Sequence, residues 1–317
     1  VSVEEDPISS EIKITQWNVT SQEGVEIVSG GWPNAPSVVV SGQYMVLHDS
    51  QNLEFYDLEN QAGQSVSSLS LDDVGSILDV AIAEDSGLAV LVIIGESSLQ
   101  FVDVDNSDSV LGQQNGTYSI VEASGSLVAW VDSSHSSPTV NLTSITGGIE
   151  IGIELNVTAT EAEDEYLEQI SGIPVNYSNA TVIDIDMSSS WMVAVVDVGP
   201  VNRTVLVDLL TGDQRMLSDP LWQSSSPSVG DGRVAFLQIA FWDPSDNIVG
   251  TNDVYLHEIE SNSTLAITHD DEVNQMGPQV LLEEVAWIEV GSDGESVLKV
   301  YSGETFQPYS SVILQSA

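Results

Sequence analysis

The sequence has no cysteine and only 5 Lys and Arg among its 317 residues, against 49 Asp and Glu. The absence of thiols excludes disulfides, thiolate nucleophiles and cysteine-ligated metal centres. The formal net charge of −44 excludes nucleic-acid binding, which requires a basic surface, and disfavours adsorption to anionic membranes. No apolar run approaches roughly 18 residues, so the sequence predicts no membrane-spanning helix.

The negative charge comes from a shortage of bases, because charged residues make up only 17% of the chain and 45 Ser and 15 Thr supply neutral polarity. Such a surface suits high salt, which screens repulsion between carboxylates, or acid, which neutralises them. Bound cations would act in the same way, so we expect stability to respond to NaCl, CaCl2 or pH. The 42% hydrophobic content allows a large core without disulfides and excludes a disordered acidic tail.

Eight of the 15 asparagines lie in N-x-[ST] sequons, whereas chance gives about three in a chain this rich in Ser and Thr. They are Asn18, Asn115, Asn141, Asn156, Asn176, Asn179, Asn202 and Asn262. Sequons accept N-linked glycans in secreted proteins; accidental matches are the alternative. The chain begins at Val1 rather than Met, which we interpret as removal of a signal segment. These features favour an extracellular or cell-surface glycoprotein of archaeal or eukaryotic origin.

A unit of about 40 residues repeats along the chain. Each copy has an apolar run after a turn, such as Leu127–Trp130, and a later run that ends in an acidic or polar turn, such as Leu53–Leu58. The copies open near Pro36, Ile77, Tyr118, Ala180, Ser226 and Gly277. Short runs rich in Val, Ile, Leu and aromatic residues predict strands. Six units of four strands predict an all-β propeller rather than a sandwich.

Two segments fall outside the six four-stranded repeats of this single predicted domain, residues 1–317. The acidic insertion 156–175 is compatible with a short helix, and residues 11–30 predict an N-terminal hairpin, giving six or seven blades. Two alternatives remain for the hairpin. It pairs with the C-terminal strand Ser311–Gln315 and closes the ring, or it adds to a blade edge of a neighbouring copy and builds a filament.

Several segments resemble blades of the TolB-type β-propeller family. One blade is Pro227–Phe236, Val254–Ile259 and Leu265–Thr268; another is Trp17–Thr20, Val25–Gly31, Pro36–Val38 and Tyr56–Leu58. The resemblance covers nearly the whole chain and implies the propeller fold. It also implies a binding or structural role, as such blades have in periplasmic and archaeal surface proteins. Most units lack the Asp-Gly turn of the family, so no specific TolB partner follows.

Two acidic loops are candidate calcium sites, because hard cations prefer clustered oxygen ligands. The first contains Asp103, Asp105 and Asp108, and the second contains Asp243, Asp246 and Asn247 with Asp253. Neither matches an EF-hand, and polar turns between strands are the alternative. The four histidines show no metal spacing. No other cofactor is predicted besides N-linked glycans.

The tryptophans divide into two groups. Trp130, Trp191 and Trp287 are predicted to occupy the same strand position in different units, where they would pack between blades. Trp17, Trp32, Trp222 and Trp242 lie nearer loops and are candidates for a glycan-binding face.

Three function classes remain. The sequence has no nucleophile elbow, phosphate loop or dinucleotide fingerprint. We therefore expect a non-enzymatic structural protein whose main partner is itself, as a subunit of a surface layer, sheath or filament. The alternatives are a monomeric glycan- or peptide-binding propeller and a secreted carbohydrate-active enzyme.

Overall fold

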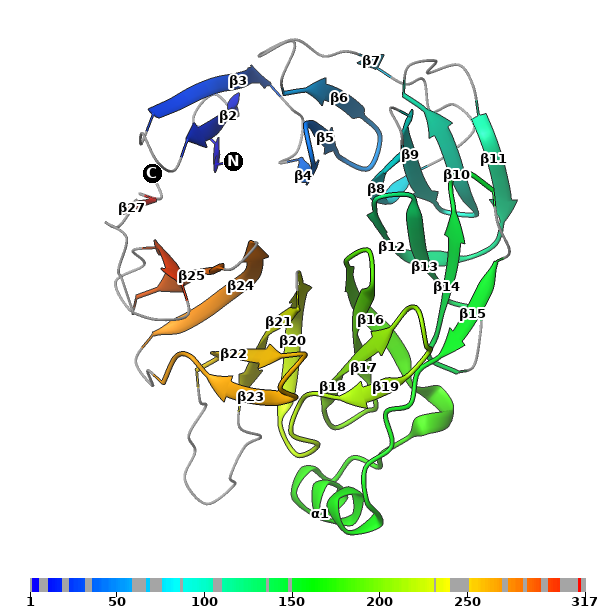
Figure 1. Cartoon of the computed structure of the whole chain (residues 1–317), viewed down its shortest axis with the longest axis vertical. Helices are drawn as coiled ribbons and strands as arrows, with labels where there is room; N and C mark the ends of the chain where they lie inside the picture. Colours follow the sequence, from blue (N-terminus) through cyan, green and yellow to red (C-terminus); the bar gives the residue numbers. More distant parts are fainter. Residues whose placement is uncertain are drawn as a thin grey trace. The chain divides into compact units, whose positions relative to one another are not determined.

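Six four-stranded sheets, each made of strands that are consecutive in sequence, form an all-β six-bladed propeller with one short helix in this computed structural model (Figure 1). The predicted fold class is confirmed, and each predicted repeat opens within three residues of the first strand of a sheet. The structure describes residues 2–5, 11–18, 23–31, 36–58, 67–68, 76–85, 88–104, 110–134, 137–147, 150–230, 232–239, 251–269, 273–281, 284–291, 296–302 and 313–314.

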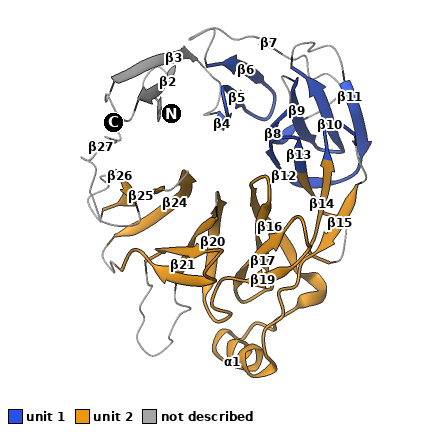
Figure 2. Cartoon of the chain, in the orientation of Figure 1, with its two compact units in different colours: residues 1–128, 144–148, 317 blue, residues 129–143, 149–316 orange. Residues whose placement is uncertain are grey.

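The chain divides into two compact units (Figure 2). Unit 1 comprises residues 1–128, 144–148 and 317, and unit 2 comprises residues 129–143 and 149–316. Within the described ranges, no helix has the length and apolar character needed to cross a bilayer.

Unit 1 contains a three-stranded sheet of order β1-β2-β3 and two four-stranded sheets of orders β4-β5-β6-β7 and β11-β10-β9-β8. The strands are β1 Ser2–Glu5, β2 Glu11–Asn18, β3 Glu23–Gly31, β4 Ser37–Ser41, β5 Tyr44–His48, β6 Leu53–Asp57, β7 Ser67–Ser68, β8 Ile77–Asp85, β9 Leu88–Gly95, β10 Ser98–Asp103 and β11 Val110–Asn115.

The boundary between the units falls within the sheet of order β12-β13-β14-β15. Its strands are β12 Tyr118–Ser124, β13 Leu127–Asp132, β14 Thr139–Ser144 and β15 Ile151–Glu154.

Unit 2 continues with helix α1, a 3-10 turn η1 and three sheets of orders β16-β17-β18-β19, β20-β21-β22-β23 and β24-β25-β26-β27. The elements are α1 Glu161–Ser171, η1 Tyr177–Asn179, β16 Thr181–Met187, β17 Trp191–Asp197, β18 Asn202–Asp208, β19 Gln214–Met216, β20 Gln223–Val229, β21 Arg233–Ile239, β22 Asp253–Glu258, β23 Ser263–Ala266, β24 Asn274–Leu281, β25 Glu284–Val290, β26 Ser296–Tyr301 and β27 Ile313–Leu314.

The C-terminal strand β27 pairs with β26, with Leu314 opposite Ser296, so it is the fourth strand of the last sheet. Ring closure by the hairpin 11–30 stays a prediction. The hairpin strands β2 and β3 pair with each other, and β1 adds to β2 with Val3 opposite Ile14. The first residues of the chain therefore supply a third strand that was not predicted. Addition to a neighbouring copy stays a prediction.

Apolar runs long enough to be buried on both faces form the second strand of the four-stranded sheets. β9 is the clearest case. On one face Leu91 and Ile93 are fully buried in a cluster with Phe55 of β6 and Ile82 of β8, and the alternate residues Val90 and Val92 are also fully buried. The turns that connect the first and second strands of the four-stranded sheets are short. Between β4 and β5 this turn contains Gly42 at φ +53, and a Cβ there would come within 2.9 Å of the Glu84 carboxylate, so the position favours glycine.

The first strands of four sheets carry a β-bulge. The register shifts lie between Ile77 and Asp79, Val182 and Asp184, Ser225 and Ser228, and Met276 and Gln279. An extra residue bends a strand and redirects the following side chain. Leu78 and Ile183, the extra residues of the first two bulges, are 52% and 44% exposed. The repeat predicted these strands but not their bulges.

Candidate functional site

The most connected polar cluster of the described residues lies where the insertion 156–175 meets β18 and β19. The chain enters it in an extended conformation, with Leu155 and Val157 buried and Asn156 and Thr158 exposed. Gln214 of β19 holds this segment from both sides. Its Oε1 accepts from the Asn156 N–H at 2.8 Å, and its Nε2 donates to the Glu154 carbonyl at 2.9 Å.

Helix α1 confirms the short helix for which the insertion was a candidate. Thr160 caps its N-terminus, and Glu163 completes a capping box by accepting from the Thr160 N–H at 2.8 Å. Acidic residues in the first turn suit the positive end of the helix dipole. The hydrogen bonds from Thr160 lower the pKa of Glu163. Gly172 ends the helix at φ +69, and Leu167 is its one buried residue.

Arg203 of β18 is the centre of the cluster and is fully buried. Its Nη1 donates to the Val157 carbonyl at 2.7 Å and to the Tyr177 hydroxyl at 2.6 Å. Its Nη2 donates to Asp164 Oδ1 at 2.9 Å and to the Pro220 carbonyl at 3.4 Å. We call Arg203, Asp164, Tyr177 and Val157 the arginine knot.

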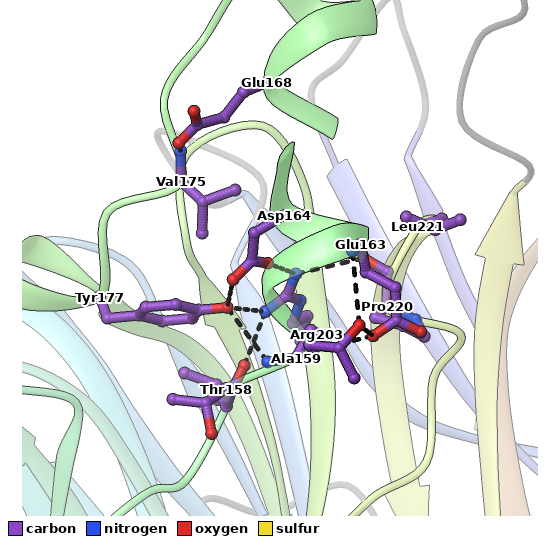
Figure 3. Close-up of polar contacts among 12 residues, drawn as sticks. Thr158, Ala159, Glu163, Asp164, Glu168, Val175, Tyr177, Arg203, Pro220 and Leu221 are labelled. Atoms are coloured by element: carbon purple, nitrogen blue, oxygen red, sulfur yellow. Dashed lines mark hydrogen bonds and ion pairs between the residues drawn. The ribbon is translucent and has the colours of Figure 1, made fainter. Parts of the chain in front are cut away.

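Figure 3 shows Asp164 of α1, Tyr177 of η1 and Arg203 pointing toward one another. The Tyr177 hydroxyl donates to Asp164 Oδ2 at 2.6 Å and accepts from the Ala159 N–H at 3.1 Å. The guanidinium carbon lies 5.6 Å from the centre of the Tyr177 ring, within cation–π range. Burial raises the pKa of Tyr177, and the hydrogen bond to Asp164 acts in the same direction.

The arginine knot is chemically saturated at its terminal atoms. Arg203 uses both terminal nitrogens, Asp164 uses both oxygens, and the Tyr177 hydroxyl donates once and accepts twice. Within the knot, Arg203 Nε is the one buried side-chain nitrogen or oxygen without a partner among the described residues. These contacts join the insertion, through Val157 and Asp164, and the neighbouring Tyr177 to Arg203 of β18. The knot is therefore an anchor for the insertion.

The other described Arg and Lys side chains are also engaged within the scaffold. Arg215 Nη1 donates to Asn262 Oδ1 at 2.8 Å, and its guanidinium carbon lies 5.9 Å from the centre of a Trp191 ring. Arg233 and Lys299 form ion pairs of 2.9 Å with Glu258 and Glu289. Every Arg or Lys whose side chain the structure describes thus has a partner in its own unit.

Two partly buried carboxylates connect successive sheets. Asp79 Oδ1 accepts from its own neighbour Val80, and its Oδ2 accepts at 2.9 Å from the N–H of Val121 in the next sheet. Asp186 repeats the arrangement with Met187 and with Val229 at 2.7 Å. Burial raises the pKa of both carboxyls, although these hydrogen bonds act against the shift. We call Asp79 and Asp186 the bridging aspartates.

Of the three histidines that the structure describes, His48 in β5 and His257 in β22 are buried. Burial lowers the pKa of both imidazoles. His257 Nδ1 is 2.8 Å from the Thr264 hydroxyl. Both side chains thus pack within strands of the scaffold.

The candidate sequons differ in accessibility. Asn115, Asn156, Asn179 and Asn262 are exposed, and Asn176 and Asn202 are half-buried. Asn141 in β14 is only 8% exposed. The side chain of Asn18 lies outside the described residues, although its backbone ends β2.

The calcium candidates are mostly outside the described residues, namely Asp105, Asp108, Asp243, Asp246 and Asn247. Asp103 ends β10, and Asp253 begins β22, where its Oδ1 accepts from the Thr268 hydroxyl at 3.0 Å. The described residues contain no group of three or more His, Cys, Asp or Glu placed to hold a metal ion. Calcium binding stays a prediction for both loops.

The tryptophan prediction is partly wrong. Trp130 and Trp287 are buried at the fourth position of β13 and β25, but Trp191 is the half-buried first residue of β17. Trp222 is half-buried and packs edge-on to Tyr255 at 6.3 Å. Trp32, Trp242 and the side chain of Trp17 lie outside the described residues, so the glycan-binding face stays a prediction.

No model of a known protein family matches the chain, and no curated protein does so either. Solved structures do match it. A puromycin-hydrolyzing peptidase from Mycobacterium tuberculosis matches with a TM-score of 0.63 at 11% identity, over 97% of this chain and 49% of that one. This chain thus spans about half the length of the peptidase.

The β-propeller domain of the Trilobed protease from Pyrococcus furiosus matches with a TM-score of 0.61 at 13% identity, over 99% of this chain and 93% of that domain. A structure from Agrobacterium tumefaciens assigned to TolB matches with a TM-score of 0.45 at 13% identity, over 76% of this chain and 80% of that one. The shared feature is the β-propeller fold. At these sequence identities, the similarities show the fold alone.

Proposed function

We propose that this chain is a non-enzymatic, secreted and N-glycosylated structural protein that associates with copies of itself in a surface layer, sheath or filament. The observation that carries the proposal is that charged side chains among the described residues bond to other groups of the same chain. Each described Arg and Lys has a partner within the scaffold, and the bridging aspartates accept backbone hydrogen bonds between sheets. Charged side chains that already bond within the scaffold favour a structural protein over an enzyme.

The remaining surface supports the same proposal. With its described Arg and Lys engaged, the chain presents carboxylates and neutral Ser, Thr and Asn side chains to solvent. Copies at a net charge of −44 repel one another unless salt or cations screen them. Association of such copies is expected in the ionic setting of an extracellular layer.

Negative-stain microscopy of the native protein tests the proposal. We expect lattices or filaments at high NaCl or in the presence of CaCl2, and dispersal at low salt. Dispersed particles under all of these conditions would contradict the proposal and favour a monomeric glycan- or peptide-binding propeller. A variant lacking residues 1–30 asks whether the N-terminal strands join the copies, since unchanged polymers would remove the donor-hairpin hypothesis.

A further inference from the structure

Three sequons meet at the arginine knot through their middle residues. The tripeptides are Asn156-Val157-Thr158, Asn176-Tyr177-Ser178 and Asn202-Arg203-Thr204. Arg203 donates both to the Val157 carbonyl and to the Tyr177 hydroxyl. The knot therefore fixes the middle residue of each sequon against unit 2, and it determines where the flanking asparagines are held.

Two of these sequons have their acceptor amide positioned alike. Asn156 Oδ1 accepts from the Thr158 hydroxyl at 2.8 Å, and Asn176 Oδ1 accepts from the Ser178 hydroxyl at 2.7 Å. Each bond occupies the amide oxygen. Neither Nδ2 has a hydrogen-bond partner among the residues that the structure describes. The nitrogen that takes an N-linked sugar is thus left unengaged, on an exposed side chain at Asn156 and a half-buried one at Asn176.

The other sequons whose side chains the structure describes lack this arrangement. In the third sequon of the knot, Thr204 is fully buried and its hydroxyl bonds to that of Ser224. In the Asn262 sequon, the amide oxygen is taken by Arg215 and the Thr264 hydroxyl by His257. Asn141 is 8% exposed, and its Oδ1 lies over Gly152, where a Cβ would approach to 3.4 Å. A sugar on Asn141 would displace the neighbouring strand.

We propose that the insertion is a glycan-bearing segment: Asn156 and Asn176 carry N-linked oligosaccharides, and Asn141 carries none. This inference rests on the proposed function only in requiring passage through an N-glycosylating secretory route. The arginine knot then fixes the two glycosylated tripeptides to the same strand, because Arg203 of β18 donates to Val157 and to Tyr177. The sugars cover the region around the acidic helix α1, so this part of unit 2 meets its surroundings through carbohydrate.

Mass spectrometry of peptides from the native protein tests the proposal. Trypsin is unsuitable, because no Lys or Arg lies between Lys13 and Arg203. A protease that cuts after Asp and Glu releases Asn141 alone in residues 133–150, Asn156 alone in 155–161, and Asn176 with Asn179 in 169–184. We expect oligosaccharide mass on the second and third peptides, with fragmentation placing it on Asn176, and the bare mass for the first.

The outcomes separate the inference from the proposed function. Bare peptides 155–161 and 169–184, with sugar on Asn115 or Asn262, would overturn the inference and leave a glycosylated protein. Sugar on Asn179 without Asn176, or on Asn141, would also overturn it. Bare peptides at every sequon would remove glycosylation from the proposed function as well, whereas lattices in the microscope would still support self-association.

A matched pair of variants shows that the sugar depends on the sequon. Thr158→Val keeps the size of an exposed side chain but removes the hydroxyl, and we expect complete loss of oligosaccharide from Asn156 with that on Asn176 retained. Thr158→Ser keeps the hydroxyl and should keep both sugars. Because Thr158 is exposed, both variants should fold, which a thermal melt checks. Sugar that persists on Asn156 in Thr158→Val would contradict the assignment.

Discussion

Unit 1 and unit 2 are stabilised by different side chains. Among the described residues of unit 1, an apolar cluster joins two sheets, with Phe55 of β6 in the same cluster as Ile82 and Leu91 of the next sheet. No described side chain of unit 1 is an Arg or a Lys. Unit 2 also has apolar clusters, but it adds Arg203, Arg215, Arg233 and Lys299, each with a partner.

The difference shows how a chain with few bases distributes them. Apolar burial and neutral hydrogen bonds are nearly independent of ionic strength, whereas exposed ion pairs weaken in salt. A buried ion pair is screened much less. The contribution of a single contact in unit 1 to stability should therefore not change with salt concentration. In unit 2, the contribution of each ion pair should fall with salt more strongly the more exposed the pair is. Four substitutions test this comparison.

The largest effect is expected for Arg203→Met. Removing the guanidinium leaves Asp164, Tyr177 and the Val157 carbonyl without their donor, and breaking a buried pair costs about 3–5 kcal/mol. Chemical denaturation should show this loss at both low and high NaCl. Limited proteolysis at the glutamates of α1 should also become faster, because the insertion loses its anchor. An unchanged free energy of unfolding would show that the knot does not stabilise unit 2.

Leu91→Ala tests the apolar side of the comparison. Leu91 is fully buried in the cluster of unit 1, and truncation of a buried Leu costs about 2–5 kcal/mol. The loss should be the same at low and high NaCl in denaturant titrations. Leu210→Ala is the matched control, since Leu210 is 91% exposed and should change stability by less than about 0.5 kcal/mol. A strong salt dependence of the Leu91→Ala loss would contradict the comparison.

Asp186→Asn is expected to have an intermediate effect with a defined pH dependence. The Met187 and Val229 N–H groups donate to different oxygens of Asp186. An Asn side chain replaces one of these oxygens with an NH2 donor, and an unmet buried group costs about 1–3 kcal/mol. The pKa of Asp186 is raised in the folded protein, so the folded state binds the proton more tightly than the unfolded chain does. Asp186 therefore adds stability as pH falls through this raised pKa and loses that contribution as pH rises.

The stability difference between the native chain and Asp186→Asn should accordingly widen when the pH is lowered from neutrality towards 3.8, the ordinary pKa of an aspartate. Denaturation at constant high NaCl removes most of the general charge repulsion from this measurement. Asp213→Asn, at an exposed position, is the control and should cost less than about 0.5 kcal/mol. A difference that narrows on acidification would show that the hydrogen bonds from Met187 and Val229 outweigh burial, so that the pKa of Asp186 is not raised.

The smallest effect is expected for Arg233→Met. The side chains of Arg233 and Glu258 are 22% and 35% exposed, and such pairs contribute about 0–1 kcal/mol. The loss should disappear at high NaCl, unlike that of Arg203→Met. If the two arginine variants lost equal stability, burial would not distinguish the two pairs.

The repeat made much of the fold predictable from the sequence. Runs such as Leu53–Leu58 and Val254–Ile259 were placed correctly, because each strand carries its own apolar pattern. The three-stranded N-terminal sheet was not fully predicted, since β1, Ser2–Glu5, is too short to carry a strand pattern of its own. The bulges also depend on the neighbouring strand and leave no local signal.

The arginine knot was missed because its partners are distant in sequence. Val157, Asp164 and Tyr177 lie 46, 39 and 26 residues from Arg203. One signal was present. In Asn202–Asp208 a lone base stands next to an apolar run, and a base at an inward strand position requires a buried acceptor. The bridging aspartates gave a similar signal. Each is an acid within an apolar strand, and a buried carboxylate requires hydrogen-bond donors.

The consecutive order of strands has an evolutionary consequence. Each hydrogen-bond ladder of β16 to β27 is completed within one continuous stretch of chain, so a gene duplication or deletion of one whole stretch would break no ladder in the others. The bridging contacts follow the same period, since Asp79 and Val121 are 42 residues apart and Asp186 and Val229 are 43 apart. A copied stretch would therefore bring its own acceptor for the sheet that follows, and such a chain could grow or shrink by whole blades.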